Sequence, residues 1–144
     1  MEEDKMSISV VYWSGTGNTQ AMAEAVAEGI KATGQEAELL EVGKADAKTV
    51  AEEAAFALGC PAMGAEVLEE SEMEPFVEEL ESYVSGKKIL LFGSYGWGDG
   101  EWMRNWEESC KEASANLVCD SVICQEEPDD EATDACKALG AALV

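Results

Sequence analysis

Histidine is absent from this chain of 144 residues. Because histidine is the usual general base of serine and cysteine hydrolases and the commonest protein ligand of zinc, its absence excludes much enzyme chemistry. Cysteine occurs five times, but no two cysteines form the C-x-x-C pair that is typical of zinc sites and dithiol redox centres. We therefore expect no metal site, and we predict that the cysteines are buried free thiols: Cys60, Cys110, Cys119, Cys124 and Cys136.

Positive charge is also scarce. Nine Lys and Arg residues stand against 31 Asp and Glu residues, for a formal net charge of -22. Such a charge repels phosphodiester backbones and anionic membrane surfaces, so we expect neither nucleic acid nor membrane as a partner. Two interpretations of the acidity stay open at this point. It confers solubility, or it steers the protein toward a positively charged face on another protein.

Long apolar runs are missing as well. No run approaches the roughly 20 residues that a membrane-spanning helix requires. The opening residues 1–5 lack the basic start and the apolar stretch of a secretory signal. We therefore expect a cytoplasmic protein, with one domain that covers residues 1–144.

Hydrophobic periodicity divides the chain into alternating strands and helices. The predicted strands cover residues 8–12, 36–42, 54–59, 89–93 and 117–124, the last interrupted at Asp120. Four predicted helices cover residues 21–30, 46–53, 101–114 and those from 130 onward. A further helix has Pro75 in its first turn and ends at Gly86. Strands that are apolar throughout are typical of parallel strands buried on both faces. The fold class predicted is therefore α/β, a three-layer doubly wound parallel sheet with helices on both faces.

The segment Ser14-Gly15-Thr16-Gly17-Asn18-Thr19 lies between the first predicted strand and the first predicted helix. Free backbone N–H groups and the helix dipole favour an anion at such a place, and ligands of parallel α/β sheets bind beyond the carboxyl ends of the strands. The glycines permit tight turns close to a ligand, while the hydroxyl and amide side chains donate hydrogen bonds. The segment therefore predicts a lysine-free site for a terminal phosphate.

Other glycine-rich loops fit these residues less well. A Walker loop needs a lysine before its Ser or Thr, and the dinucleotide fingerprint needs a third glycine where Gln20 stands, so both patterns fail. A simple glycine-rich turn with Asn18 as the helix cap is the remaining alternative. It accounts for the glycines but not for the four donor side chains in six positions.

This loop and two later ones resemble the short-chain bacterial flavodoxins, and the likeness runs almost from end to end. The first loop of that family reads T/S-x-T/S-G-N-T, which the segment from Ser14 to Thr19 matches. The later loops are Cys60-Pro61-Ala62-Met63-Gly64-Ala65-Glu66 and Gly93-Ser94-Tyr95-Gly96-Trp97-Gly98-Asp99-Gly100-Glu101-Trp102. The resemblance implies a flavodoxin-like five-stranded sheet in the order 2-1-3-4-5, with FMN bound where the strand order reverses. That order is known from flavodoxins themselves and does not follow from the periodicity.

The resemblance also implies which residues hold FMN, without a covalent bond. They are Ser14, Gly15, Thr16, Gly17, Asn18, Thr19, Pro61, Ala62, Met63, Gly64, Glu66, Ser94, Tyr95, Gly96 and Trp97. The isoalloxazine ring is a large flat plate, and Met63 and Trp97 are expected to cover its two faces. A core methionine and a surface tryptophan are the alternatives. Of the other tryptophans, Trp102 and Trp106 lie four residues apart on a predicted helix and are expected to be buried or partly buried in the core, whereas Trp13 is expected only to pack beside the phosphate loop.

Gly64 is expected to have the central redox role. In this family the peptide after the methionine reorients when the flavin gains one electron, so that a carbonyl, here that of Gly64, accepts a hydrogen bond from flavin N5. Glycine lowers the cost of the positive φ angles on that path, although an ordinary turn glycine is the alternative. By the same resemblance Glu66 bonds flavin N3, the backbone of Gly96 bonds the pyrimidine oxygen, and Ser94 and Ala62 lie along the ribityl chain.

Two residues depart from the pattern of the family. Pro61 stands where several relatives have a hydroxyl residue that touches the phosphate, and Ala65 stands where they often have Asp. We expect somewhat lower affinity for the phosphate and a different energy of the turn after Gly64.

The implied function is low-potential electron transfer on FMN between redox partner proteins, and not catalysis on a substrate. The protein adjusts the cofactor by hydrogen bonds, stacking and charge, and acidic residues around the flavin oppose the second electron. The acidic surface is expected to dock weakly and transiently on basic faces of reductases and oxidoreductases. We expect the carrier to be a monomer.

Two rival functions are weaker. A flavin-dependent reductase on the same fold usually needs basic residues for the second phosphate of nicotinamide, but Arg104 is the only basic residue between Ser94 and Cys110. A phosphoacceptor signalling domain needs paired acids at the end of the first strand, where Tyr12-Trp13-Ser14 stands.

Overall fold

The computed structural model describes residues 7–144 except residues 16, 64–67, 97, 99 and 119. The strands are β1 (Ile8–Tyr12), β2 (Ala37–Glu41), β3 (Ala55–Gly59), β4 (Lys88–Tyr95), β5 (Asn116–Leu117) and β6 (Val122–Gln125). The helices are α1 (Asn18–Ala32), the 3-10 turn η1 (Val42–Lys44), α2 (Ala47–Val50), α3 (Met73–Leu80), α4 (Glu101–Glu112) and α5 (Asp130–Leu143). Strands and helices alternate along the chain, as the periodicity predicts.

All strands pair in parallel, in the order β2-β1-β3-β4-β5. The fifth position of the sheet is shared, because β5 pairs with the start of β4 and β6 pairs with its end, from Phe92 opposite Val122 to Tyr95 opposite Gln125. The predicted strand 117–124 is thus interrupted, as expected, and two short strands stand in its place. The five-stranded order 2-1-3-4-5 is confirmed.

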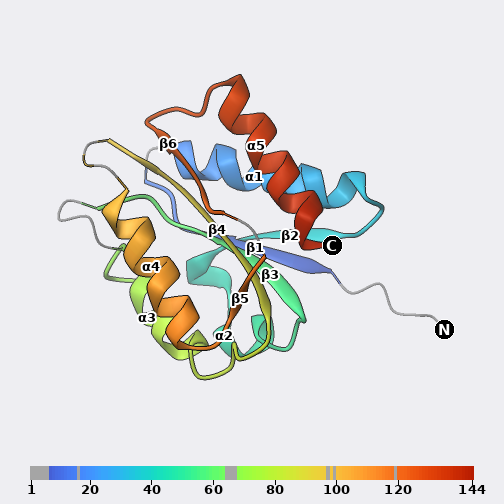
Figure 1. Cartoon of the computed structure of the whole chain (residues 1–144), viewed down its shortest axis with the longest axis vertical. Helices are drawn as coiled ribbons and strands as arrows, with labels where there is room; N and C mark the ends of the chain where they lie inside the picture. Colours follow the sequence, from blue (N-terminus) through green and yellow to red (C-terminus); the bar gives the residue numbers. More distant parts are fainter. Residues whose placement is uncertain (1–6, 16, 64–67, 97, 99, 119) are drawn as a thin grey trace.

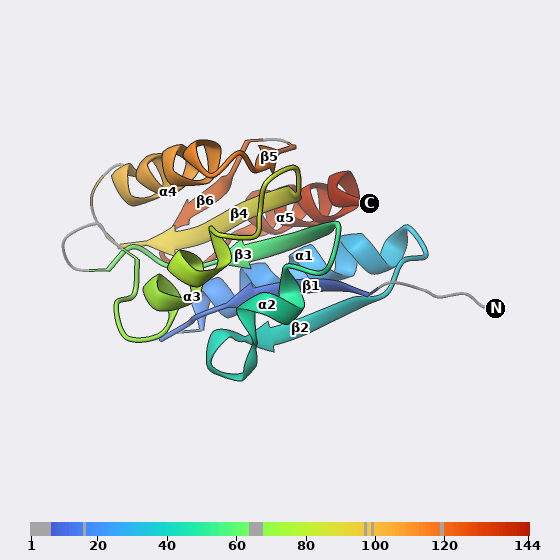
Figure 2. The same ribbon diagram turned by 90° about the horizontal axis from the view of Figure 1, so that it is seen from below.

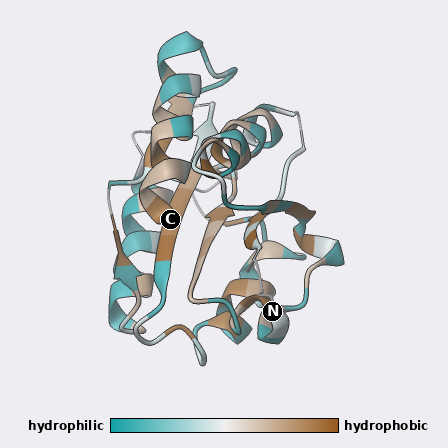
Figure 3. Cartoon of the chain, turned by 90° about the vertical axis from the view of Figure 1, so that its right-hand side faces the viewer, coloured by the Kyte–Doolittle hydropathy of each residue, from teal (hydrophilic) through white to brown (hydrophobic). Residues whose placement is uncertain are grey.

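Helices cover both faces of the sheet. Figure 1 shows α1 and α5 side by side on one face, and α2, α3 and α4 on the other; Figure 2 shows the same layers from below. Each face has its own apolar core, one containing Met22, Ile30 and Leu90, the other Phe56, Leu91 and Trp102. In Figure 3 the central strands are brown and the outer surfaces of the helices are largely teal. Burial on both faces explains why β1, β3 and β4 are largely apolar. The polar residue inside β1, Ser9, donates hydrogen bonds from its N–H and its hydroxyl to the Glu53 carboxylate, and β4 is polar only near its two ends.

Three predicted helices extend beyond the observed ones. The helix with Pro75 in its first turn ends at Leu80 and not at Gly86. The helix predicted over residues 46–53 covers only Ala47–Val50, capped by the Asp46 side chain, because residues 51–54 turn the chain into β3. The helix predicted over residues 101–114 ends at Glu112, since Ser114 adopts a left-handed conformation at φ 68°.

The cysteines are largely as predicted. The four that lie in the described part of the chain are free, and Cys60, Cys110 and Cys136 are buried. Burial raises the pKa of each of these three thiols to about 12, so none is a reactive thiolate at neutral pH. Cys124 is half-buried, which corrects the prediction for that residue, and Cys119 lies outside the described residues.

Two candidate features are not found in the described part of the molecule. No helix there combines the length and the apolar character needed to cross a membrane. Nor do three or more potential ligand side chains among those residues come together in a way that could hold a metal ion.

Candidate cofactor site

The glycine-rich loop joins the end of β1 to the start of α1. Gly17 precedes the helix in a left-handed conformation, with φ 97°, which suits a residue without a side chain. The Ser14 hydroxyl accepts hydrogen bonds from the backbone N–H groups of Gly17 (3.0 Å) and Gln20 (3.3 Å). The cap position is therefore held by Gly17, which argues against the alternative of Asn18 as cap. Thr16 lies outside the described residues.

The start of α1 has spare donors. For the backbone N–H groups of Asn18 and Thr19, no acceptor is found among the described residues. The first N–H groups of a helix have no partner within the helix, and the helix dipole adds a partial positive charge there. The loop thus offers neutral donors to an anion.

A buried pair of hydroxyl groups joins this loop to β4. Thr19 Oγ1 and Ser94 Oγ lie 3.1 Å apart, and both side chains are buried. The backbone N–H of Ser94 also points to Thr19 Oγ1, at 3.4 Å. Thr19 therefore has a structural bond beside the phosphate contact that the sequence predicts for it.

The loop after β3 runs along the end of β4. Cys60 N–H donates to the carbonyl of Phe92 (3.1 Å), and Ala62 N–H donates to the carbonyl of Ser94 (3.0 Å). These bonds extend the pairing of β3 and β4 beyond the last regular residue of β3. Pro61, Ala62 and Met63 are half-buried as a result. Gly64 and Glu66, to which the sequence assigns roles at the flavin, lie outside the described residues.

The loop after β4 is tied to the loop after β6. Glu126 N–H donates to the carbonyl of Tyr95 (2.7 Å), and the Gln125 side-chain amide donates to the carbonyl of Gly96 (3.3 Å). Glu126 itself is left-handed, with φ 59°. Trp97, the predicted cover of one flavin face, lies outside the described residues.

These loops enclose a groove of about 590 Å³ at the carboxyl edge of the sheet, within the usual size range of ligand pockets. It is lined by Trp13, Ser14, Gly15, Asn18, Thr19, Pro61, Ala62, Met63, Ser94, Tyr95, Gly96, Glu126 and Glu127. Most of the predicted cofactor residues that the structure describes thus meet in one place. Gly17 is the exception, because it is exposed at the helix cap and does not line the groove.

Three residues of the groove are missing from the sequence prediction: Trp13, Glu126 and Glu127. Trp13 was expected only to pack beside the loop. The two glutamates directly follow β6, and residues beyond the carboxyl ends of parallel strands are where ligands bind. That rule, applied to the fifth strand, would have found them.

The groove is consistent with what comparison with known proteins shows. The model of the flavodoxin family matches residues 10–140. The flavodoxin of Clostridium beijerinckii is 49% identical over 127 residues, which cover 88% of this chain and 92% of that protein. The flavodoxin of Megasphaera elsdenii is 43% identical, with 94% and 96% covered. The chain belongs to the flavodoxin family.

Solved structures of flavodoxins have the same fold. The two-electron reduced Megasphaera elsdenii flavodoxin superposes with a TM-score of 0.86 and covers 94% of this chain and 97% of its own. A flavodoxin from the domain Archaea, 30% identical, gives a TM-score of 0.84 and covers 96% of each chain. As a flavodoxin, the protein is an electron carrier of low potential that uses FMN.

In this flavodoxin chain a glutamate anchors the far end of the loop after β3. Glu69, 6% exposed, accepts hydrogen bonds from the backbone N–H groups of Ser71, Glu72 and Met73 and from the Ser71 hydroxyl. It thereby caps the start of α3. Burial disfavours its charge, but these hydrogen bonds outweigh burial, and the net effect lowers the pKa of the Glu69 carboxyl.

We predict that Glu69→Gln lowers the free energy of unfolding at neutral pH by about 1 kcal/mol, the usual contribution of a helix cap. Because the pKa of Glu69 is lower in the folded state, its stabilisation is complete above the unfolded pKa, near 4.5, and is lost as pH falls through the folded pKa. Urea unfolding from neutral to acidic pH measures the difference. The exposed neighbour gives the control Glu70→Gln, with the same change in net charge. A deficit of E69Q that does not shrink in acid would contradict the assignment.

Proposed function

We propose that the groove at the carboxyl edge of the sheet holds FMN with its phosphate at the loop from Ser14 to Thr19. The observation that carries this proposal is the meeting of three loops, from β1, β3 and β4, in one groove of suitable size. FMN, when bound, supplies the chemistry of one-electron transfer. The protein supplies the binding site and the electrostatic environment.

The phosphate is held by neutral donors. No lysine or arginine lines the groove as described, and the N–H groups of Asn18 and Thr19 have no acceptor among the described residues. Hydrogen bonds to a charged group are strong and short in range, so they outweigh the more distant repulsion from acidic side chains. Ser14 keeps its hydroxyl hydrogen for the phosphate while its oxygen holds the loop.

The flavin ring lies between the other two loops in this proposal. Met63 covers one face and Trp97 the other, the backbone of Gly96 bonds the pyrimidine oxygen, and Ser94 and Ala62 lie along the ribityl chain that leads to the phosphate. The half-buried position of Met63 on the groove supports its part. The roles of Thr16, Gly64 and Glu66, and that of Trp97, rest on the resemblance of their motifs to flavodoxins.

We predict that Asn18→Ala weakens FMN binding roughly 10- to 100-fold, the loss expected for one hydrogen bond to a charged group. Asn18 lines the groove and its side chain makes no hydrogen bond to the described residues, so the loop should keep its shape. Titration of the apoprotein with FMN and with riboflavin measures the effect. Riboflavin, which lacks the phosphate, should bind the variant and the parent equally.

Gln20→Ala is the control for this prediction, since Gln20 lies on the same turn but its amide points to Glu24 (3.4 Å) and it does not line the groove. It should leave both affinities unchanged. Equal losses for FMN and riboflavin in N18A would remove Asn18 from the phosphate site.

Two glutamates lie on the groove near the proposed flavin. Glu126 and Glu127 line it, and the loop that carries them is fixed to Tyr95 and Gly96. A carboxylate near the flavin opposes the addition of negative charge. We propose that this pair contributes to the low potential of the carrier.

We predict that Glu127→Gln raises the midpoint potential of the second electron by tens of millivolts. A carboxylate about 10 Å away, at an effective dielectric constant of about 40, contributes about 0.8 kcal/mol, or about 35 mV. Spectroelectrochemical titration of the FMN-bound protein measures the shift. Glu112→Gln, at the exposed far end of α4, removes the same charge away from the groove and should change the potential much less. Equal shifts in the two variants would mean that the potential depends on net charge alone and not on the position of Glu127 at the groove.

The partners that we propose are redox proteins with basic faces, bound weakly and transiently by a monomeric carrier. The net charge of -22 supports electrostatic steering toward such faces. The free thiols among the described cysteines are typical of a reducing compartment and support a cytoplasmic location. The two apolar cores share one sheet, which supports a single domain over residues 1–144.

We predict that electron transfer to a lysine-rich haem protein slows by about tenfold or more as ionic strength rises from about 0.01 to 0.5 M, because salt screens the attraction. Stopped-flow mixing of the reduced carrier with the oxidised acceptor measures the rate constant. An acidic haem protein as acceptor is the control, and its rate should rise with salt. A flat profile for the basic acceptor would exclude steering.

A further inference from the structure

Cys60, the first residue beyond β3, is a buried junction for hydrogen bonds from three directions. Its side chain has no exposed surface. Its N–H donates to the carbonyl of Phe92 (3.1 Å), its carbonyl accepts from the indole Nε1–H of Trp102 (3.0 Å), and its sulfur accepts from the N–H of Glu69 (3.4 Å). Residues from both ends of the loop after β3 therefore meet at this point.

Trp102 lies on α4 and reaches across to this junction. Its side chain is 1% exposed, and its ring packs against Tyr95 with centroids 5.7 Å apart at 50°. Tyr95 lines the cofactor groove. The residue on β4 that lies beside Cys60 is Gly93, and only a glycine fits there. A Cβ on Gly93 would lie 2.1 Å from the Cys60 carbonyl oxygen and 3.2 Å from the Trp102 ring. The absence of a side chain at Gly93 thus lets the Cys60 carbonyl and the Trp102 indole pack directly against the β4 backbone.

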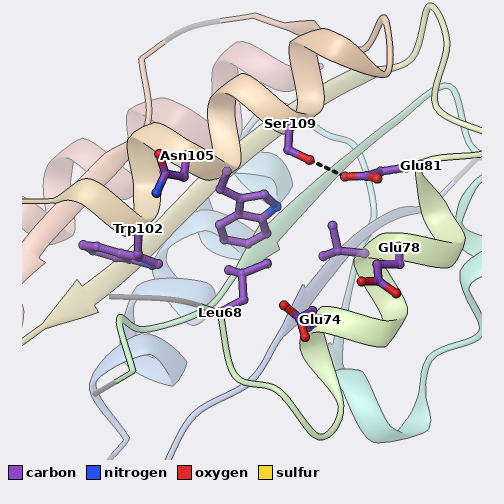
Figure 4. Close-up of a pocket in the computed structure, with 9 residues that line it drawn as sticks. Leu68, Glu74, Glu78, Glu81, Trp102, Asn105 and Ser109 are labelled. Atoms are coloured by element: carbon purple, nitrogen blue, oxygen red, sulfur yellow. Dashed lines mark hydrogen bonds between the residues drawn. The ribbon is translucent and has the colours of Figure 1, made fainter. Parts of the chain in front are cut away.

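Trp106, one turn further along α4, differs from Trp102 in one respect. It is equally buried, at 2% exposed, yet its indole N–H has no hydrogen-bond partner among the described residues. Both rings line a cavity of about 280 Å³ between α3 and α4. Figure 4 shows Trp102 at one end of this cavity, with Leu68 and Glu74 along its floor and Glu81, which accepts from Ser109, at the other end. An indole that is buried on this helix therefore does not gain a hydrogen-bond acceptor from burial alone.

We propose that Trp102 is a positioning residue of the flavin site, which acts through the Cys60 carbonyl. The indole holds Cys60, and with it the adjoining Pro61 and Ala62, against the end of β4, where these residues line the groove. Glu69 holds the same cysteine from the other end of the loop. This role rests on the proposed binding of FMN in the groove. In this role, the hydrogen bond from Trp102 to Cys60 contributes to the affinity for FMN and to the midpoint potentials of the bound flavin.

The matched pair Trp102→Phe and Trp106→Phe tests this proposal. Each variant removes an indole N–H from a buried aromatic site on the same helix, but only the first removes a bond to Cys60. We expect W102F to weaken FMN binding about three- to tenfold, as for the loss of one buried hydrogen bond. We also expect the gap between the two one-electron midpoint potentials to narrow in W102F. W106F should change FMN affinity less than twofold and leave that gap as it is.

Hydrogen exchange in the unmodified protein provides a second measurement that needs no substitution. In NMR spectra of the apoprotein, the indole N–H of Trp102 should exchange slowly, and bound FMN should slow it further. The exchange of the Trp106 indole should not depend on FMN. If W102F and W106F weaken FMN binding equally, or if exchange at Trp102 is indifferent to FMN, the positioning role is overturned while FMN binding stands. If the parent protein fails to bind FMN, the proposed function itself fails.

Discussion

Parallel pairing of β1, β3 and β4 is the constraint on which the rest of the molecule depends. Each of these strands is buried on both faces, so most of its side chains are apolar, and the polar residues that line the groove lie at or just beyond the strand ends. Because the strands run in one direction, these ends lie at one edge of the sheet. The polar residues Ser14 and Ser94, about 80 positions apart in the chain, are neighbours in the groove for that reason.

In the proposed phosphate site, short-range hydrogen bonds have to offset the acidity of the protein. A molecule of net charge -22 repels an anion, and the groove as described has no basic side chain to offset that repulsion. Backbone N–H groups at the start of α1 and nearby hydroxyl groups act over a few ångströms, where they exceed the screened repulsion from distant carboxylates. The same carboxylates oppose the addition of electrons to the cofactor. In this proposal, phosphate binding depends on hydrogen bonds over a few ångströms, whereas the low potential depends on carboxylates that act over longer distances.

Much of the fold and the phosphate loop were predictable from local patterns, whereas the groove residues of the loops after β3 and β4 were predicted from their resemblance to flavodoxins. The alternation of strands and helices was correct because apolar periodicity depends on neighbouring residues only. The glycine-rich loop was recognisable because its donors and glycines are contiguous. Errors occurred where distant segments decide: the helix predicted at 46–53 is shorter because the chain must turn into β3, and β4 continues to Tyr95 because β6 pairs with its end. The same pairing of β6 with β4 brings Glu126 and Glu127 to the groove.

By itself, the sequence determined the alternation of elements, the apolar character of the central strands and the chemistry of the phosphate loop, because each depends on residues close together in the chain. Tertiary structure alone decided which distant groups meet. Thr19 and Ser94 join two loops across 75 residues, and two glutamates complete the groove. Trp102 and Trp106 are the sharpest case. They lie one turn apart on the same helix and are equally buried, yet among the described residues only the Trp102 indole has a hydrogen-bond partner. The carbonyl of Cys60, 42 residues earlier, lies within reach of that indole and not of the Trp106 indole.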